Sequence, residues 1–107
     1  MGKKEFIKII EKFAEKLRKD LSVNNIIFFG SRTSNKYHKD SDIDLMIVSK
    51  DFDGMHFINR ASKMYNYWES DMPVDFICYT PKEFEILKKK ISIVRDALSQ
   101  GIIIKPK

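Results

Sequence analysis

Apolar residues recur at every third or fourth position along three stretches of this sequence, which is the spacing of an amphipathic helix. Near the third stretch, Thr80, Pro81 and Glu83 form the signature of a helix start, and Gly101 is a helix stop. We therefore expect a single helix between Pro81 and Gly101. The apolar positions of the three stretches are Phe6, Ile10, Phe13, Leu17 and Leu21; Phe57, Ala61, Met64, Tyr65 and Trp68; and Phe84, Leu87, Ile91, Val94 and Leu98.

Short apolar runs between these stretches are typical of buried β-strands. The predicted strands are Ile26–Phe29, Ile43–Ser49, Val74–Tyr79 and Ile102–Ile104. A short helix is expected to begin near Ser31, which gives the order α-β-α-β-α-β-α-β. This order predicts an α/β (α+β) fold, in which a mixed sheet of about four strands is flanked by helices. We expect residues 1–107 to form one domain.

The composition agrees with a folded chain, since 43% of its 107 residues are hydrophobic and 33% are charged. The net charge of +5 favours anionic partners such as nucleotides or RNA, but it also suits a merely soluble surface. The run Lys88-Lys89-Lys90 lies within a helical pattern and fits a solvated face, so the sequence has no strong nucleic-acid signal.

Several classes of protein are excluded by simple features of the sequence. The single cysteine, Cys78, excludes an internal disulfide, and no cysteines and histidines have the spacing of a zinc site. No apolar run approaches the ~20 residues that a membrane span needs, and the N-terminus has no signal-peptide core. We therefore expect a cytoplasmic protein.

Three aspartates are the candidates for chemistry. Asp42 and Asp44 share one face at the start of a strand, about 7 Å apart, and repel each other unless a cation lies between them. Asp75 lies within another apolar strand, where a buried carboxylate needs a partner. Solvated carboxylates, or a pair of Asp75 with Arg32, Lys63 or Arg60, would be the structural explanation. If the two strands are neighbours, the three carboxylates form a site for two Mg²⁺ ions.

Gly30 and Ser31 follow the first predicted strand. A glycine here lets the backbone approach a ligand, and a following helix N-terminus with a serine hydroxyl suits phosphate oxygens. An ordinary turn between a strand and a helix explains the same two residues.

Together, Gly30-Ser31-Arg32 and Ser41-Asp42-Ile43-Asp44-Leu45 resemble the motif of the minimal nucleotidyltransferases in the DNA polymerase beta superfamily. That superfamily includes aminoglycoside nucleotidyltransferases and the small antitoxins that are paired with HEPN-type toxins. The resemblance covers nearly the whole chain.

The resemblance implies roles for six residues. Gly30 and Ser31 would hold the β- and γ-phosphates of a nucleoside triphosphate, and Arg32 is a further triphosphate contact. Two Mg²⁺ ions would be bound by Asp42, Asp44 and Asp75, and an acceptor hydroxyl would attack the α-phosphate with pyrophosphate as leaving group.

The sequence departs from the family motif in the loop that follows Arg32. Asn35 stands where a second glycine is usual, and Ser34 stands where a basic residue is common. Asparagine tolerates a positive φ, so the turn can survive. His38 is either a phosphate contact or a surface residue of the loop.

The resemblance implies an enzyme that transfers AMP from ATP to a hydroxyl of a partner protein, with a HEPN-type toxin as the expected acceptor. One alternative is a non-catalytic antitoxin module that binds a nucleotide or neutralises the toxin by contact. Another is transfer to a small molecule such as an aminoglycoside. The sequence leaves the oligomeric state open. The aromatic cluster Tyr65, Tyr67 and Trp68 belongs either to the core or to a partner-facing patch.

Overall fold

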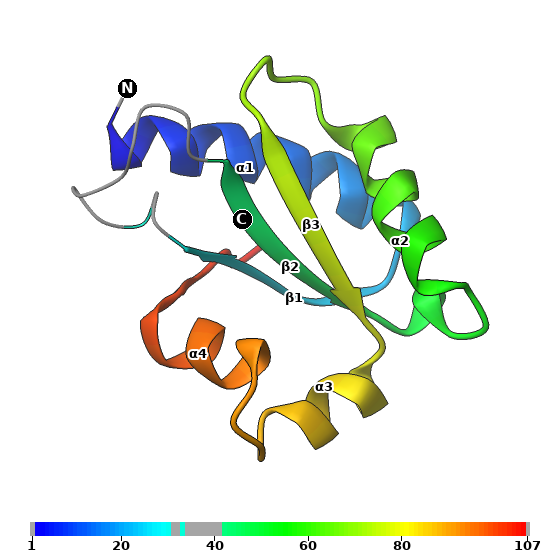
Figure 1. Cartoon of the computed structure of the whole chain (residues 1–107). Coiled ribbons are helices and arrows are strands. Elements are labelled where there is room, and N and C mark those ends of the chain that lie inside the picture. Colours follow the sequence, from blue (N-terminus) through cyan, green and yellow to red (C-terminus); the bar gives the residue numbers. More distant parts are fainter. Residues whose placement is uncertain (1, 31–32, 34–41, 107) are drawn as a thin grey trace.

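A computed structural model describes residues 2–30, 33 and 42–106 of the chain (Figure 1). Its centre is a mixed sheet with the strand order β3-β2-β1-β4. β1 is antiparallel to both β2 and β4, whereas β2 and β3 are parallel. The mixed, four-stranded sheet predicted from the sequence is confirmed. The strands are β1 (Val23–Phe29), β2 (Ile43–Ser49), β3 (Val74–Tyr79) and β4 (Ile102–Ile103).

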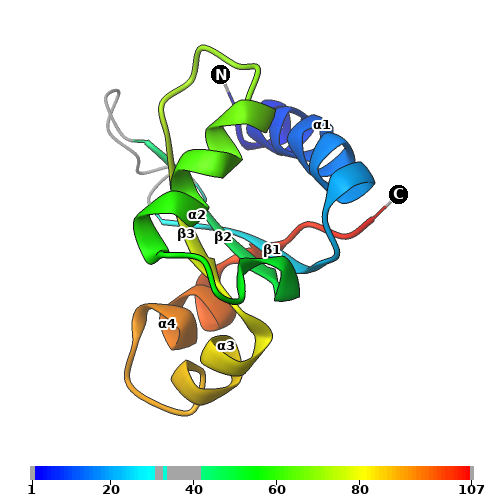
Figure 2. The same cartoon turned by 90° about the vertical axis from the view of Figure 1, so that its right-hand side faces the viewer.

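Helices cover both faces of the sheet (Figure 2). α1 (Lys3–Asp20) and α2 (Phe57–Met64) pack on one face, and α3 (Pro81–Leu87) and α4 (Ile93–Gln100) pack on the other. Alternate residues of β2 point to opposite faces, so Leu45 and Ile47 join the core under α1, while Met46 and Val48 join the core under α3 and α4. This alternation places Asp44 on the side of α3 and α4.

The single helix expected after Pro81 is wrong, because the structure has two helices there. The capping box of Thr80 and Glu83 starts α3 as predicted, but α3 ends at Leu87. Ser92 then caps α4: its hydroxyl accepts a hydrogen bond from the backbone N–H of Arg95 at 3.3 Å and donates one to the carbonyl of Leu87 at 2.7 Å. Ile91, which the periodic pattern placed on the apolar stripe, is instead 93% exposed at this break.

Several boundaries differ from those expected; β4, for example, ends at Ile103 and not at Ile104. β1 begins at Val23, because Val23 pairs with Ser49 of β2 across an irregularity in the register. α2 ends at Met64 and is followed by a 3-10 turn, η3 (Tyr65–Tyr67). The helix expected to begin near Ser31 falls on residues that lie, apart from Thr33, outside the described ranges.

A buried arginine links the two helical layers at the edge of the sheet. Arg60 of α2 is only 7% exposed, and its guanidinium pairs with the Glu83 carboxylate at 2.6 Å. It also donates hydrogen bonds to the carbonyls of Met55 and Cys78, at 3.0 and 3.3 Å. Arg60 is therefore occupied by Glu83 rather than by Asp75, which was one of the pairings considered from the sequence.

Among the described residues, no helix has the length and apolar character needed to cross a bilayer.

Candidate active site

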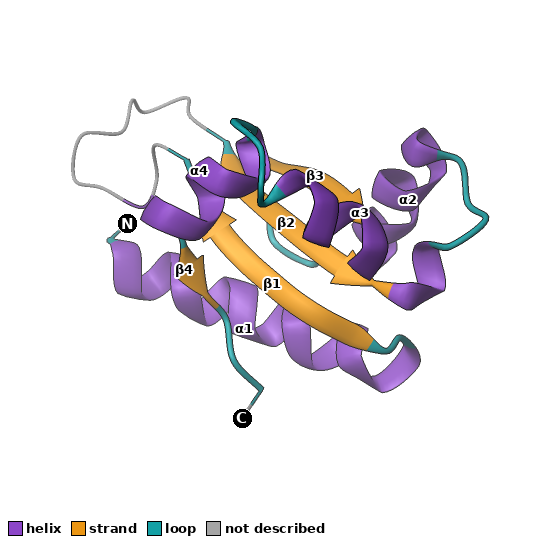
Figure 3. Ribbon diagram, turned by 90° about the horizontal axis from the view of Figure 1, so that it is seen from below, coloured by secondary structure: helices purple, strands orange, loops and turns teal. Residues whose placement is uncertain are grey.

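Three strand ends meet at one end of the sheet, where β1 finishes and β2 and β3 begin (Figure 3). In the register, Phe29 lies opposite Asp44, and Asp44 lies opposite Asp75. Side chains of directly paired residues point to the same face, and Asp42 precedes Asp44 by two positions. The fold therefore brings the three aspartates singled out in the sequence to one region, on the side of α3 and α4.

Asp42 and Asp75 are in direct contact through their side chains. Partial burial raises the pKa of the Asp75 carboxyl group, and both a hydrogen bond with Asp42 and the charge of Asp42 raise that pKa further. Two carboxylates this close repel each other, and a cation bound between them would relieve that repulsion.

Asp44 adopts a different position, next to Gly30. Gly30 has a φ of +85°, and a Cβ added there would lie 2.1 Å from Oδ2 of Asp44. The glycine is therefore required both by the left-handed backbone and by the carboxylate that lies against it. The sequence suggested room for a ligand at this glycine, and the structure shows that Asp44 uses part of that room.

The charges of all three aspartates act on one another. Burial raises the pKa of Asp44 to about 6, and the charges of Asp75 and then Asp42 contribute to this rise. Within the described ranges, however, no three Asp, Glu, His or Cys side chains stand close enough together to hold one metal ion. The pairing of β2 with β3 brings the three aspartates to one region, as expected if the two strands are neighbours. Their role as ligands of a metal stays a prediction.

A cleft of about 440 Å³ opens beside Gly30, between the end of β1 and α4. Its walls include Thr33 on one side and Ile93, Asp96 and Gln100 on the other. Thr33 is tied to Gly30, because its N–H and its hydroxyl both donate to the carbonyl of Gly30, at 3.1 and 2.7 Å. The volume is within the range of sites that bind small molecules and cofactors.

The residues of α4 that line this cleft were not identified as site residues from the sequence, although their spacing of three and four places them on one helix face. Ser31 and Arg32, predicted to contact the triphosphate, lie outside the described residues, as do Ser34, Asn35 and His38.

Tyr65 is a further neighbour of the carboxylates that was assigned only to an aromatic cluster. Its hydroxyl donates to the carbonyl of Val74, at 2.8 Å, on the strand that carries Asp75. Burial raises the pKa of Tyr65, and the charges of Asp75 and Asp42 raise it further. The phenol is therefore close enough to the two aspartates to be affected by their charges.

Comparisons with known proteins agree with this description. The family model for the nucleotidyltransferase domain matches residues 10–102. The fold is similar to that of a proposed nucleotidyltransferase from Sulfolobus solfataricus, with a TM-score of 0.69 and 19% identity over 98% of this chain and 84% of that one. It is also similar to a mutant of the toxin-antitoxin MntA-HpeT, with a TM-score of 0.55 and 19% identity over 100% of this chain and 75% of that one. No curated protein matches the sequence.

Proposed function

Because the chain belongs to the nucleotidyltransferase domain family, we propose that it is a Mg²⁺-dependent enzyme that transfers AMP from ATP to a hydroxyl of a partner protein. The observation that carries this proposal is that Asp44 and Asp75 are paired at adjacent strand ends near the cleft at Gly30, with Asp42 two residues before Asp44. We take residues 1–107 as one nucleotidyltransferase domain.

The residues present fit a divalent cation. Carboxylate oxygens are the ligands that Mg²⁺ prefers, and a cation would relieve the repulsion between Asp42 and Asp75, which raises the pKa of Asp75 together with its partial burial. Asp42, Asp44 and Asp75 would hold the metal, with Asp44 turned away from Gly30 toward the other two. When bound, Mg²⁺ would neutralise phosphate charge and stabilise the entering and leaving oxygens.

The chain's own residues would position the reactants. The triphosphate would lie along the cleft, with Gly30, Ser31 and Arg32 as its contacts on the side of β1. An acceptor hydroxyl oxygen would form a bond to the α-phosphorus while the bond from that phosphorus to the bridging β-phosphate oxygen breaks and pyrophosphate leaves. We assign the Asp75 carboxylate, which is exposed at the sheet edge, as the group that takes up the hydroxyl proton.

The partner is proposed from a structural neighbour. The MntA-HpeT structure is a toxin-antitoxin, and its similarity to this chain supports a toxin as the acceptor. We propose a HEPN-type toxin and a cytoplasmic location for the pair.

The test is transfer of label from ATP carrying a radioactive α-phosphate to a candidate toxin in the presence of Mg²⁺. Asp42→Asn and Asp44→Asn should each reduce transfer by about 100-fold or more, since each removes a charge that acts on the reacting phosphate. Asp53→Asn, an exposed acid in the turn after β2, is the matched control. Equal labelling by the wild type and the Asp42→Asn variant would show that these carboxylates do not perform the reaction.

A second candidate function is a non-catalytic antitoxin that neutralises its partner by contact. The carboxylate of Asp44 favours it, because it lies against Gly30 and takes up part of the space that a triphosphate would need there. Calorimetry with ATP and Mg²⁺ discriminates between the two, because only the catalytic protein must bind both. A rescue assay with the aspartate variants is the complementary test, since neutralisation by contact should survive these substitutions.

A further inference from the structure

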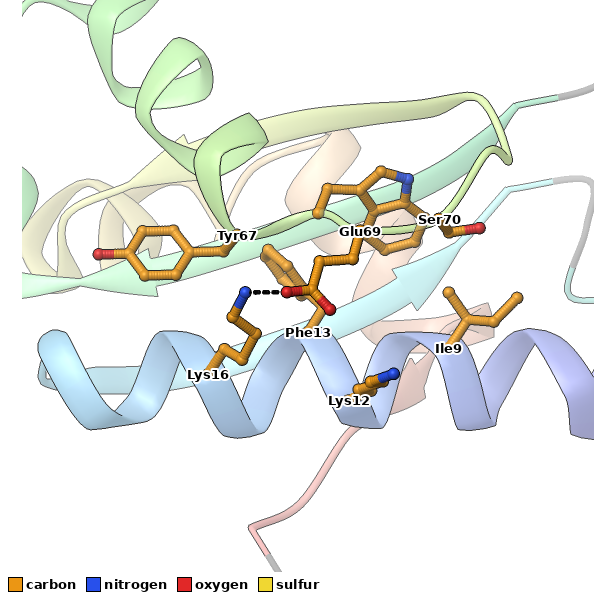
Figure 4. A pocket seen from close by; sticks show the side chains of 8 residues that line it. Ile9, Lys12, Phe13, Lys16, Tyr67, Glu69 and Ser70 are labelled. Atoms are coloured by element: carbon orange, nitrogen blue, oxygen red, sulfur yellow. Dashed lines mark hydrogen bonds and ion pairs between the residues drawn. The ribbon is translucent and has the colours of Figure 1, made fainter.

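A second cavity, of about 240 Å³, lies between α1 and the segment that follows η3 (Figure 4). Its apolar walls come from Ile9 and Phe13 of α1 and from Trp68, whose ring contacts that of Phe13 edge to face at 5.6 Å between centroids. Lys12 and Lys16 of α1 line one side, and Glu69 lies opposite them. The cavity therefore combines an aromatic wall with a charged rim.

The rim has an excess of positive charge. Lys16 pairs with Glu69 across the cavity. A hydrogen bond from Lys16, together with the charges of Lys16 and Lys12, lowers the pKa of Glu69, so the charges of both lysines act on this carboxylate. Within the described part of the chain, Lys12 forms no ion pair of its own, and two cations therefore share one anion. A ligand with one more carboxylate would balance the positive charge of the rim.

The size of the cavity limits what can enter it. Sites for cofactors and drug-sized ligands are usually about 300–1,000 Å³. The space at Trp68 is smaller and suits a single large apolar side chain. A side chain of this kind, buried at the centre of a contact, is the usual anchor of a protein–protein interface.

We propose that this cavity is a docking site for a partner protein, which inserts one large apolar side chain against Phe13 and Trp68 and pairs a neighbouring carboxylate with Lys12. The partner segment would thus contain Phe, Leu or Met next to Asp or Glu. This surface lies on the face of α1, opposite the face with the carboxylates, and its role does not require that nucleotide transfer occurs.

The docking site is connected to the candidate active site by a short segment. The indole N–H of Trp68 donates to the carbonyl of Met72 at 2.9 Å, and the chain then enters β3, whose second residue is Asp75. A partner held at Trp68 would therefore contact the segment that leads into the strand with Asp75, from the opposite face of the sheet.

The experiment is an NMR titration of the isotope-labelled protein with the blocked tripeptide Glu-Phe-Glu. The chain has one tryptophan, so the indole N–H signal of Trp68 reports the cavity without ambiguity. We expect this signal to shift on saturation, with a dissociation constant about tenfold larger for Glu-Ala-Glu, which lacks the anchor. The peptide Lys-Phe-Lys should also bind several-fold more weakly, because its charges repel the rim.

Variants of the protein separate docking from folding. Lys12→Glu should weaken Glu-Phe-Glu binding about fivefold, whereas Lys89→Glu, an equal change of charge on the opposite side of the sheet, should leave it unchanged. Ile9→Phe should fill the cavity and abolish binding while the unfolding midpoint stays the same. Asp42→Asn should bind the peptide normally even where it no longer transfers AMP, so the docking proposal and the proposed function fail separately.

Three results would overturn the docking proposal. The first is the absence of an indole shift at millimolar peptide. The second is binding of phenylacetate as tight as that of Glu-Phe-Glu, which would assign the cavity to a small molecule. The third is self-association that Ile9→Phe abolishes, which would make a second copy of this chain the occupant.

Discussion

Replacing Asp44 by asparagine is expected to stabilise the metal-free protein at neutral pH, although the same change should remove its activity. Asp44 lies in the field of Asp75 and Asp42 and is partly buried, so its charge is unfavourable in the folded state. Asparagine has nearly the same shape, and it keeps the contact with Gly30 without the charge. A catalytic carboxylate that costs stability is a common consequence of gathering like charges at a reaction site.

The magnitude follows from the pKa. An increase from the ordinary value of 3.8 to about 6 corresponds to at most about 3 kcal/mol of unfolding free energy. Solvent screens part of this, since Asp44 is partly exposed, and about 1–2 kcal/mol remains. Below pH 3.8 the group is protonated in both states, so it has no effect. As pH rises from 3.8 to about 6, the unfolded chain loses this proton first, so stability falls, and the full loss is reached above pH 6.

Urea unfolding in EDTA at pH 7.5 and at pH 3.8 measures this effect. The gain for Asp44→Asn should be about 1–2 kcal/mol at pH 7.5, or about 4–10 °C in Tm, and should be largely lost at pH 3.8. Asp53→Asn is the control, with no gain at either pH. Mg²⁺ should raise the Tm of the wild type more than that of Asp44→Asn. The reasoning is refuted if Asp44→Asn is neutral or destabilising at pH 7.5 in EDTA.

Three further substitutions or reactions test other parts of the structure. Gly30→Ala should lower the free energy of unfolding by at least about 2 kcal/mol, because it combines backbone strain with a clash against Asp44. Gly54→Ala is the control: with a φ of +81° and no atom within 4 Å, it should lower that free energy by only about 1 kcal/mol. Equal losses in urea unfolding would exclude the clash. Arg60→Met should lower the unfolding free energy by about 2 kcal/mol, because it removes the donor to the carbonyls of Met55 and Cys78 and leaves the Glu83 carboxylate with only the N–H of Thr80. A double-mutant cycle with Glu83→Gln should show coupling. Burial raises the pKa of the Cys78 thiol to about 12, despite the opposing charge of Arg60. The rate at which Cys78 reacts with a disulfide reagent should therefore equal the rate of global unfolding. Rapid labelling of the folded protein would contradict this.

The strands were predictable because their apolar runs are short and sharply bounded. Ile43–Ser49 and Val74–Tyr79 were expected with the bounds that the structure has. The break between α3 and α4 was hidden, because the apolar period continues through Ile91 as if one helix were present. Ser92 carried the opposing signal, since a serine followed by a first helical turn is a common N-cap. Local capping thus prevailed over the periodic pattern.

The site was only partly predictable for a different reason. The alternation of side chains along a strand is a property of the backbone, so the common face of Asp42 and Asp44 follows from their spacing, and the position of Asp75 follows once β2 and β3 pair. The rotamer of Asp44 depends on the space that Gly30 leaves open, which is a tertiary contact between two strands. No pattern in the sequence reports such a contact. The cleft against α4 depends in the same way on how the helix packs over β1.

The choice between a catalytic and a non-catalytic protein therefore depends on one side chain. Gly30 leaves room for the carboxylate of Asp44, and repulsion from Asp75 and Asp42 favours that position against the glycine while no cation is bound. A divalent cation between Asp42 and Asp75 would reverse this preference, because it attracts the third carboxylate instead of repelling it. Rotation of a partly exposed side chain between staggered positions needs no change of the backbone. The arrangement of the aspartates is thus compatible with a metal site that forms when the metal binds.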